Sequence, residues 1–201
     1  MGVLVGRSAP DFTANAVLGD GSIVPDFNLA KNIDGKYAVI FFYPLDFTFV
    51  CPSELIAFDH RLKEFTDRGV EVIGVSIDSH YTHNAWRNTA INDGGIGQVG
   101  YPLVADINHG ICQAYDVEHP AAGVAFRASF LIDTKGDVRH QVVNDLPLGR
   151  NIDEMLRMID ALQFTEEHGE VCPAGWNKGD KGMTATTDGV AEYLAENADT
   201  L

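Results

Sequence analysis

A continuous apolar run, residues 37–43 (YAVIFFY), ends at Pro44 and limits the architectures open to this chain. The run offers no polar face, so it is predicted to form a strand covered on both sides, as in the central sheets of α/β proteins. Hydrophobic residues make up 45% of the 201 residues, which is enough to build such a core. The length favours one domain of ordinary size with, at most, an extra terminal arm.

The rest of the chain alternates between strand and helix patterns. Strands are predicted at residues 70–76 and 102–106, and a hairpin at 128–133 and 138–143, where Gly136 supplies the positive φ of a tight turn. The spacing of apolar residues predicts helices at residues 52–68, 110–115 and 152–165, the polar stretch 79–92 is compatible with another, and residues 11–36 carry only turn signals. This order predicts an α/β fold with a mixed central sheet flanked by helices, and it matches a thioredoxin-like core.

The composition changes near the C-terminus. Beyond His168 the residues Gly, Lys, Thr and Asp become frequent. We therefore expect residues 1–166 to form the core domain and residues 167–201 to form an arm outside it, with a short amphipathic helix at residues 190–194.

The net charge of −15 restricts the partners of the chain. An acidic surface repels phosphate backbones and anionic lipid, so neither nucleic acid nor a membrane is an expected partner. No apolar run approaches the ~20 residues of a membrane helix, and the first residues carry no signal-peptide pattern. The expected location is the cytoplasm.

Three cysteines, Cys51, Cys112 and Cys172, lie far apart in the sequence. An odd number argues against a fixed disulfide framework, and in a reducing compartment a cysteine that matters is more often catalytic, redox-active or metal-binding. No zinc-finger spacing is present. The histidines are scattered and are expected at the surface or at helix caps, so no metal and no cofactor is implied: His80, His83, His109, His119 and His140.

Cys51 lies between the apolar run and the first long helix, where open α/β sheets carry their chemistry. Pro52 suits the first position of a helix, and the positive end of the helix dipole favours a thiolate at Cys51. Thr48 can donate a hydroxyl hydrogen bond to the sulfur, and Pro44 shapes the turn and limits solvent access. On these residues alone, a buried structural cysteine is an equal alternative. A dithiol reductase is disfavoured because Cys-x-x-Cys is absent.

Two separated motifs resemble one protein family. The string FYPLDFTFVCP, with Pro44, Thr48 and Cys51, is similar to the signature of peroxiredoxins, and HGEVCPAGW around Cys172 resembles the resolving-cysteine segment of the typical 2-Cys subgroup. The segments AFR (125–127) and VNDLP (143–147) also fit that subgroup, which includes alkyl hydroperoxide reductase C and the thiol-specific antioxidant proteins. The similarity extends over nearly the whole chain.

The resemblance implies a thiol-dependent peroxidase with a role in antioxidant defence and redox homeostasis. It implies that Cys51 attacks hydrogen peroxide or an organic hydroperoxide and becomes a sulfenic acid. Thr48 and Arg127 would support the sulfur and the peroxide, and Glu54 and Arg150 match positions that orient this network. Cys112 has no matching role and is expected in the core.

The resemblance also implies partners. Cys172 of a second subunit would resolve the sulfenic acid as an intersubunit disulfide, in a homodimer that assembles into a decamer. Thioredoxin is the expected reductant, with a dedicated flavoprotein reductase as the alternative, and holdase chaperone function is a possible second activity. The segments 94–97 (GGIG) and 193–194 (YL) resemble those of easily over-oxidised members, which predicts intermediate to high sensitivity to excess peroxide.

Overall fold

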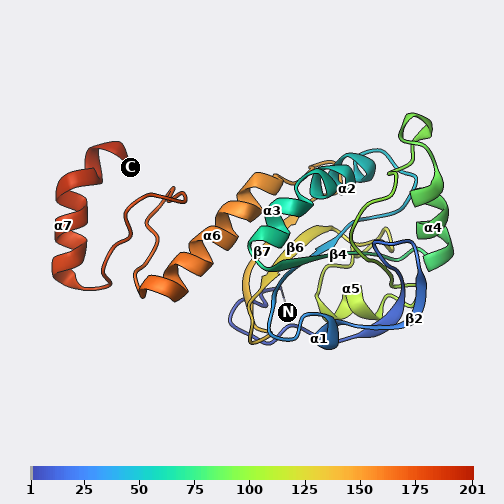
Figure 1. Cartoon of the computed structure of the whole chain (residues 1–201), viewed down its shortest axis with the longest axis horizontal. Helices are drawn as coiled ribbons and strands as arrows, with labels where there is room; N and C mark the ends of the chain where they lie inside the picture. Colours follow the sequence, from blue (N-terminus) through green and yellow to red (C-terminus); the bar gives the residue numbers. More distant parts are fainter. Residues whose placement is uncertain (1) are drawn as a thin grey trace. The chain divides into compact units, whose positions relative to one another are not determined.

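The computed structural model describes residues 2–201, and within them seven strands form one mixed sheet in the order β2-β1-β5-β4-β3-β6-β7 (Figure 1). Strands β3, β4 and β5 are parallel, whereas every other neighbouring pair is antiparallel. The mixed sheet confirms the predicted fold class. The strand bounds are β1 Thr13–Val17, β2 Ile23–Asn28, β3 Tyr37–Phe42, β4 Val70–Ser76, β5 Leu103–Ala105, β6 Arg127–Ile132 and β7 Val138–Asn144.

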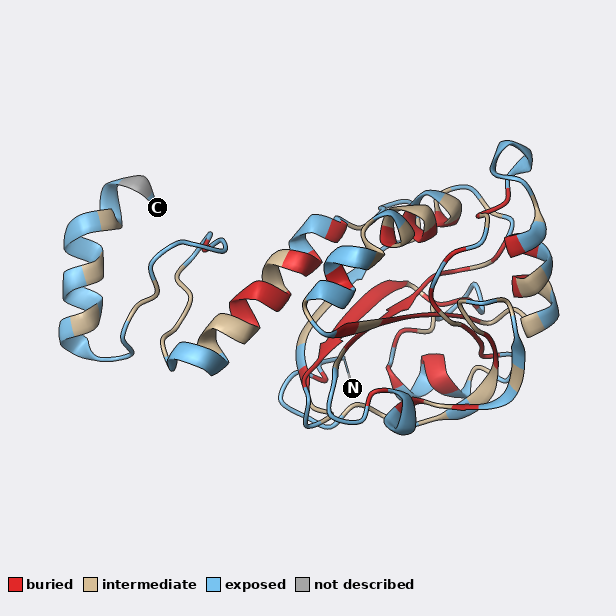
Figure 2. Cartoon of the chain, in the orientation of Figure 1, coloured by how far each residue is buried: buried red, intermediate tan, exposed pale blue. Residues whose placement is uncertain are grey.

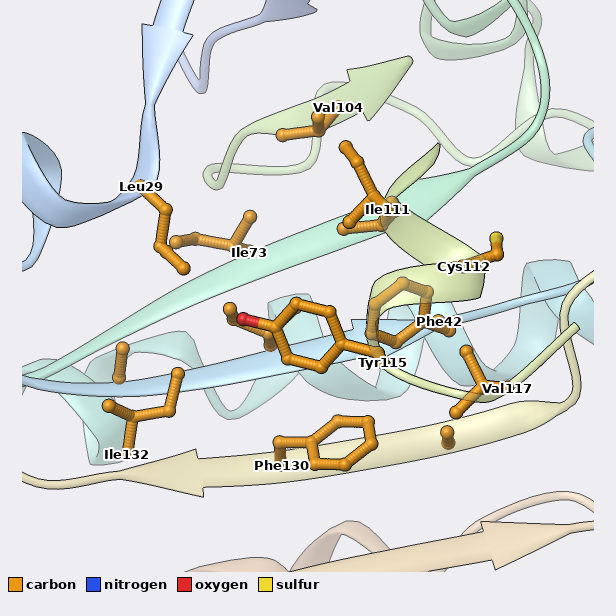
Figure 3. Packing of buried hydrophobic residues seen from close by; sticks show 14 of the residues in the cluster. Leu29, Phe42, Ile73, Val104, Ile111, Cys112, Tyr115, Val117, Phe130 and Ile132 are labelled. Atoms are coloured by element: carbon orange, nitrogen blue, oxygen red, sulfur yellow. The ribbon is translucent and has the colours of Figure 1, made fainter. Parts of the chain in front are cut away.

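The apolar run forms β3, which is central in the sheet as predicted. Successive side chains of a strand point to opposite faces, so neighbouring phenylalanines meet different layers. Phe41 stacks on Phe58 with ring centroids 4.1 Å apart, whereas Phe42 packs on Tyr115 at 5.1 Å (Figure 3). Both faces of β3 are therefore covered, which explains why the run carries no polar residue.

The helices confirm most of the predicted ranges, and the polar stretch after residue 79 does form a helix. Ser79 caps that helix by accepting a hydrogen bond from the Thr82 N–H at 3.1 Å. The bounds are α1 Leu29–Asn32, α2 Cys51–His60, α3 Leu62–Asp67, α4 His80–Asn88, α5 Gly110–Ala114, α6 Ile152–His168 and α7 Thr187–Asn197, with 3₁₀ turns at Ile91–Asp93 and Ala198–Thr200.

The prediction of one helix over residues 52–68 was wrong, because the chain breaks at Arg61 into α2 and α3. The Arg61 N–H bonds to the Phe58 carbonyl at 3.2 Å, three residues back, as in a tight turn. The break follows from tertiary contacts around Gly100. The Asp59 carboxylate accepts the Gly100 N–H at 2.8 Å, and a Cβ added at Gly100 would lie 2.7 Å from the Leu62 Cδ2 atom.

Strands β1 and β2 had no counterpart in the sequence prediction. The sequence of β1, TANAV, contains alanines that have little strand propensity, and β2 contains Pro25. Proline is tolerated because β2 is the edge strand and pairs only with β1. The sheet itself, and not local preference, holds these residues extended.

The predicted hairpin is confirmed as β6 and β7. Gly136 has φ +85°, and its N–H closes the turn onto the Asp133 carbonyl at 3.0 Å. The register places Arg127, at the start of β6, opposite Asn144, at the end of β7. Both residues therefore lie at the sheet edge where β3 ends.

The chain divides into two compact units, Met1–Ile152 and Asp153–Leu201. The first holds the sheet, and its buried residues follow the strands (Figure 2). In the second, Val171 and Met183 form an antiparallel bridge, and Trp176 packs on Phe164 of α6. The division between a domain of residues 1–166 and an arm of residues 167–201, which was drawn from composition, stays a prediction.

Among the helices that the structure describes, none is long and apolar enough to cross a bilayer.

Candidate active site

The candidate site forms at one side of the sheet, where β3 and β7 end and β6 begins. The parallel strand β3 leads through residues 43–50 into α2, which begins at Cys51. Because β6 runs antiparallel to β3, its first residue, Arg127, lies beside the end of β3. The segment after β7 returns to the same edge and carries Arg150. Local topology thus brings distant residues to the first turn of α2.

Two polar side chains converge on the Cys51 sulfur. The Thr48 Oγ1 atom lies 3.0 Å from Sγ, and the Arg127 Nη1 atom lies 3.3 Å from it. Cys51 itself is fully buried. Pro52 occupies the second position of α2, one residue later than expected, and no side chain in the described chain caps this helix. A hydroxyl, a guanidinium and a helix start are all donors suited to an anionic sulfur.

Glu54 connects the two arginines. Its Oε2 atom accepts from Arg127 Nη1 at 2.7 Å and from Arg150 Nη2 at 2.9 Å, while Oε1 accepts from Arg150 Nε at 2.9 Å. All three side chains are 5% exposed or less. Burial would raise the pKa of the Glu54 carboxyl, but the charges and hydrogen bonds of Arg150, with the charge of Arg127, outweigh burial and hold that pKa below its ordinary value.

Backbone carbonyls fix both arginines. Arg127 Nε donates to the Leu146 carbonyl at 2.6 Å. Arg150 Nη1 donates to the carbonyls of Phe42 and Ala128 at 2.7 and 2.8 Å, and its guanidinium lies 5.2 Å from the Phe41 ring centroid. These acceptors were missed in the sequence analysis, because a carbonyl has no signature in the residue type that bears it.

A second polar cluster anchors the segment before Cys51. His83 Nδ1 lies 2.7 Å from Asp46 Oδ2, and the Tyr43 hydroxyl donates to Asp46 Oδ1 at 2.8 Å. The expectation that His83 is a surface or capping residue was wrong, because its side chain is fully buried. Burial raises the pKa of the Asp46 carboxyl, and the His83 contact only partly offsets this effect. Pro44 is buried at the start of the same segment.

The other two cysteines have different surroundings. Cys112 is fully buried in the core cluster, as expected, and burial raises the pKa of its thiol. Cys172 lies in the second unit and is half-buried. Its Sγ atom lies 3.5 Å from the Ala161 carbonyl oxygen.

Within residues 2–201, no three His, Cys, Asp or Glu side chains lie together in a group that could hold a metal ion.

Solved structures define the class of protein. The chain resembles the reduced 2-Cys peroxiredoxin of Plasmodium vivax with a TM-score of 0.92 and 48% identity, over 96% of this chain and 99% of that one. It resembles thioredoxin peroxidase I of Plasmodium yoelii with a TM-score of 0.77 and 50% identity, over 88% of this chain and 100% of that one. The fold is thioredoxin-like, and the chain is an oxidoreductase of the thiol-dependent peroxidase class.

Sequence comparisons identify the family. The profile described as the AhpC/TSA family matches residues 5–141, and that of the C-terminal domain of 1-Cys peroxiredoxin matches residues 161–196, a segment that here includes Cys172. Alkyl hydroperoxide reductase C of Helicobacter pylori is 60% identical over 196 residues, 98% of each chain. The chain therefore belongs to the AhpC/TSA family.

Proposed function

We propose that this antioxidant peroxidase reduces hydrogen peroxide and organic hydroperoxides with Cys51 as the attacking thiolate. The observation that carries the proposal is the convergence of Thr48 Oγ1 and Arg127 Nη1 on one buried sulfur, at 3.0 and 3.3 Å. The thiolate attacks the terminal peroxide oxygen and the O–O bond breaks. The departing oxygen takes a proton and leaves as water or an alcohol, and Cys51 becomes a sulfenic acid.

Thr48 and Arg127 act on the reacting atoms. The Thr48 hydroxyl has one proton and two acceptors in reach, the Leu45 carbonyl at 2.7 Å and the Cys51 sulfur at 3.0 Å. A sulfur anion draws that proton toward itself, and a bound peroxide oxygen can take the same place. The Arg127 guanidinium cannot lose its charge, so it stabilises both the thiolate and the oxygen that becomes negative. The Cys51 N–H at the start of α2 serves the same oxygens, and Pro44 keeps water away.

Glu54 and Arg150 serve as positioning residues. Glu54 holds Arg127 in place with one oxygen, and Arg150 fixes Glu54 through both oxygens. A planar guanidinium tied to a carboxylate and to fixed carbonyls has little freedom to turn away from the sulfur.

Cys172 of a second subunit is proposed to resolve the sulfenic acid. Its thiol attacks the Cys51 sulfur, the S–O bond breaks, water leaves and an intersubunit disulfide forms. Because Cys51 is fully buried, its sulfur must first leave the pocket, which requires the first turn of α2 to unwind. The 2-Cys name of the P. vivax relative supports this assignment.

The proposed partners are further copies of the chain and a reductant. As the resemblance to typical 2-Cys peroxiredoxins implies, the chain would form a homodimer that assembles into a decamer. Thioredoxin would reduce its disulfide, as the name of the P. yoelii relative suggests for that protein. A flavoprotein reductase is the alternative, and turnover with each reductant distinguishes them. We also propose a cytoplasmic site of action, because an odd number of cysteines argues against a fixed disulfide framework.

A non-reducing gel after one equivalent of peroxide tests the mechanism. Wild type should give a dimer-sized band that dithiothreitol removes. Cys51→Ser should give no band, and Cys172→Ser should give none while its Cys51 sulfenic acid reacts with dimedone. Cys112→Ser is the matched control and should behave as wild type. Bridged dimers that persist without Cys51 or without Cys172, or a Cys51 that peroxide leaves unmodified, would contradict the proposal.

A further inference from the structure

Cys172 lies over one face of α6. Arg157, Ala161 and Thr165 follow one another at four-residue spacing, so their side chains share that face. The Cys172 sulfur donates to the Ala161 carbonyl at 3.5 Å, and the Thr165 Oγ1 atom lies 3.7 Å away. We call this face of α6, formed by Arg157, Ala161 and Thr165, the Cys172 dock.

Trp176 holds the segment that carries Cys172 against α6. Its side chain is 3% exposed, and its ring lies 4.9 Å from the Phe164 ring of α6 between centroids. Its indole N–H donates to the Asp180 carbonyl at 3.1 Å, and its own carbonyl accepts from Arg157 Nη1 at 2.7 Å. The segment is thus tied to α6 by one aromatic contact and one charge-assisted hydrogen bond.

Glu154 orients the Arg157 guanidinium toward the Trp176 carbonyl. Arg157 Nε and Nη2 each donate to one Glu154 oxygen at 2.7 Å, which leaves Nη1 directed at the Trp176 carbonyl. An ion pair this exposed adds little stability by itself. Its effect here is geometric, because a guanidinium held by two parallel bonds presents its remaining nitrogen in a fixed direction.

The dock limits access to the Cys172 sulfur. In the docked position the thiol donates to a backbone carbonyl of α6, and the side chain is half-buried. Cys172 therefore has to leave the dock before its sulfur can meet Cys51 of a second subunit.

We propose that Arg157 is a positioning residue that sets how fast Cys172 becomes available. Through the Trp176 carbonyl it holds the segment on α6 and delays release of the thiol. This inference rests on the proposed role of Cys172. During the delay, a second peroxide can oxidise the Cys51 sulfenate to sulfinate, with release of one water or alcohol and no disulfide. The Arg157 contact thus slows disulfide formation and raises the sensitivity of Cys51 to excess peroxide.

Alkylation of Cys172 measures the dock without any peroxidase chemistry. In a Cys51→Ser background, iodoacetamide labelling of Cys172 is followed by peptide mass spectrometry. Arg157→Gln should be labelled roughly three- to tenfold faster, since it loses one partly exposed charge-assisted hydrogen bond. Arg157→Lys keeps the charge but not the fork, and should also be faster than its parent. Lys63→Gln, which removes the exposed Lys63–Asp67 pair of α3, is the control and should not change the rate. Equal labelling of Arg157→Gln and its parent overturns the inference.

Rapid mixing of the protein with intact Cys51 tests the consequence. Arg157→Gln should leave the peroxide-dependent oxidation phase unchanged, accelerate disulfide formation and lower the Cys51 sulfinate fraction at excess peroxide. Slower or unchanged disulfide formation overturns the proposed delay. If Cys172→Ser fails to abolish the disulfide, the proposed function itself is wrong, and the alkylation result still decides whether the dock exists.

Discussion

The Cys51 site depends on donors whose positions are fixed from several directions. Arg127 contacts the sulfur, Glu54 and the Leu146 carbonyl at once, so its guanidinium has little freedom to turn away from the sulfur. In a site that excludes water, such a preorganised charge acts strongly on an oxygen that becomes negative. We propose that this charge is the main contribution of the protein to the oxidation step.

Replacing Arg127 tests that contribution. Arg127→Gln should slow the second-order reaction of Cys51 with hydrogen peroxide by about 100-fold or more, the usual effect of removing one such donor. Arg127→Lys should recover only part of the rate, because an ammonium cannot meet three partners in one plane. Stopped-flow tryptophan fluorescence measures the rate. Arg139→Gln, which removes an Arg–Asp pair of the β6–β7 hairpin, is the control. A wild-type rate in Arg127→Gln would exclude the role.

The ionisation of Glu54 should make the free energy of unfolding depend on pH. Its folded pKa is lowered, so its ionisation stabilises the fold above the unfolded pKa, and this contribution is lost as the pH falls through the folded value. At pH 7, Glu54→Gln should cost about 3 kcal/mol, because two arginines lose their buried partner. The difference from wild type should shrink below about pH 4. Urea unfolding across pH measures it.

Glu71→Gln, which removes an exposed pair with Lys36, is the matched control for that experiment and should show a small difference at every pH. A Glu54→Gln penalty that stays constant down to pH 3 would show that packing, and not charge, explains the effect.

At the residue scale, the side chains that contact the Cys51 sulfur could be predicted, but the buried contacts that hold the surrounding segment in place could not. Cys51, Thr48 and Arg127 stand in recognisable segments, and the structure brings all three together. The Asp46–His83 contact could not be predicted, because the two residues are 37 positions apart and neither shows from its neighbours that it is buried. The sequence around an isolated histidine does not show that it is buried, because burial depends on the carboxylate that the fold packs against it.

At the scale of elements, sequence patterns predicted the strands and turns that are determined by their own residues. β3, β4 and the β6–β7 hairpin have apolar runs or a turn glycine that specify them. β1 contains alanines and β2 contains a proline, so pairing within the sheet decides both. The break at Arg61 depends on the loop at Gly100, which is distant in sequence. Elements fixed by distant contacts were the ones missed.

The β6–β7 turn gives a prediction that isolates backbone conformation from packing. Gly136 has φ +85°, and a Cβ added there meets no atom within 4 Å. Gly136→Ala should therefore destabilise the fold by about 1 kcal/mol through strain alone. Gly136→Asn should cost less, because asparagine tolerates positive φ. Thermal unfolding ranks the two variants, and an alanine variant as stable as wild type would contradict the strain argument.

At the scale of the whole molecule, α7 is a helix with little support from the chain that carries it. None of its eleven residues is buried, and Val190 and Leu194 are 37% and 42% exposed. Its own support is a Thr186 cap that accepts the Gly189 N–H at 3.1 Å and an exposed Lys181–Glu196 pair. A helix this short is marginal in water without tertiary packing. Its order should therefore depend on assembly.

Hydrogen exchange read by mass spectrometry tests this dependence. In the reduced assembly the amides of residues 187–197 should be protected. On dilution to the dissociated chain they should exchange as fast as a free peptide, since no burial remains to hold the helix. The amides of β3, which is buried on both faces, should be equally slow in both states and serve as the internal control. Leu194→Ser should lower the protection of α7 in the assembly and change nothing in the dissociated chain. Equal protection of α7 in both states would mean that the helix is stable by itself, and that its exposed apolar residues need no partner.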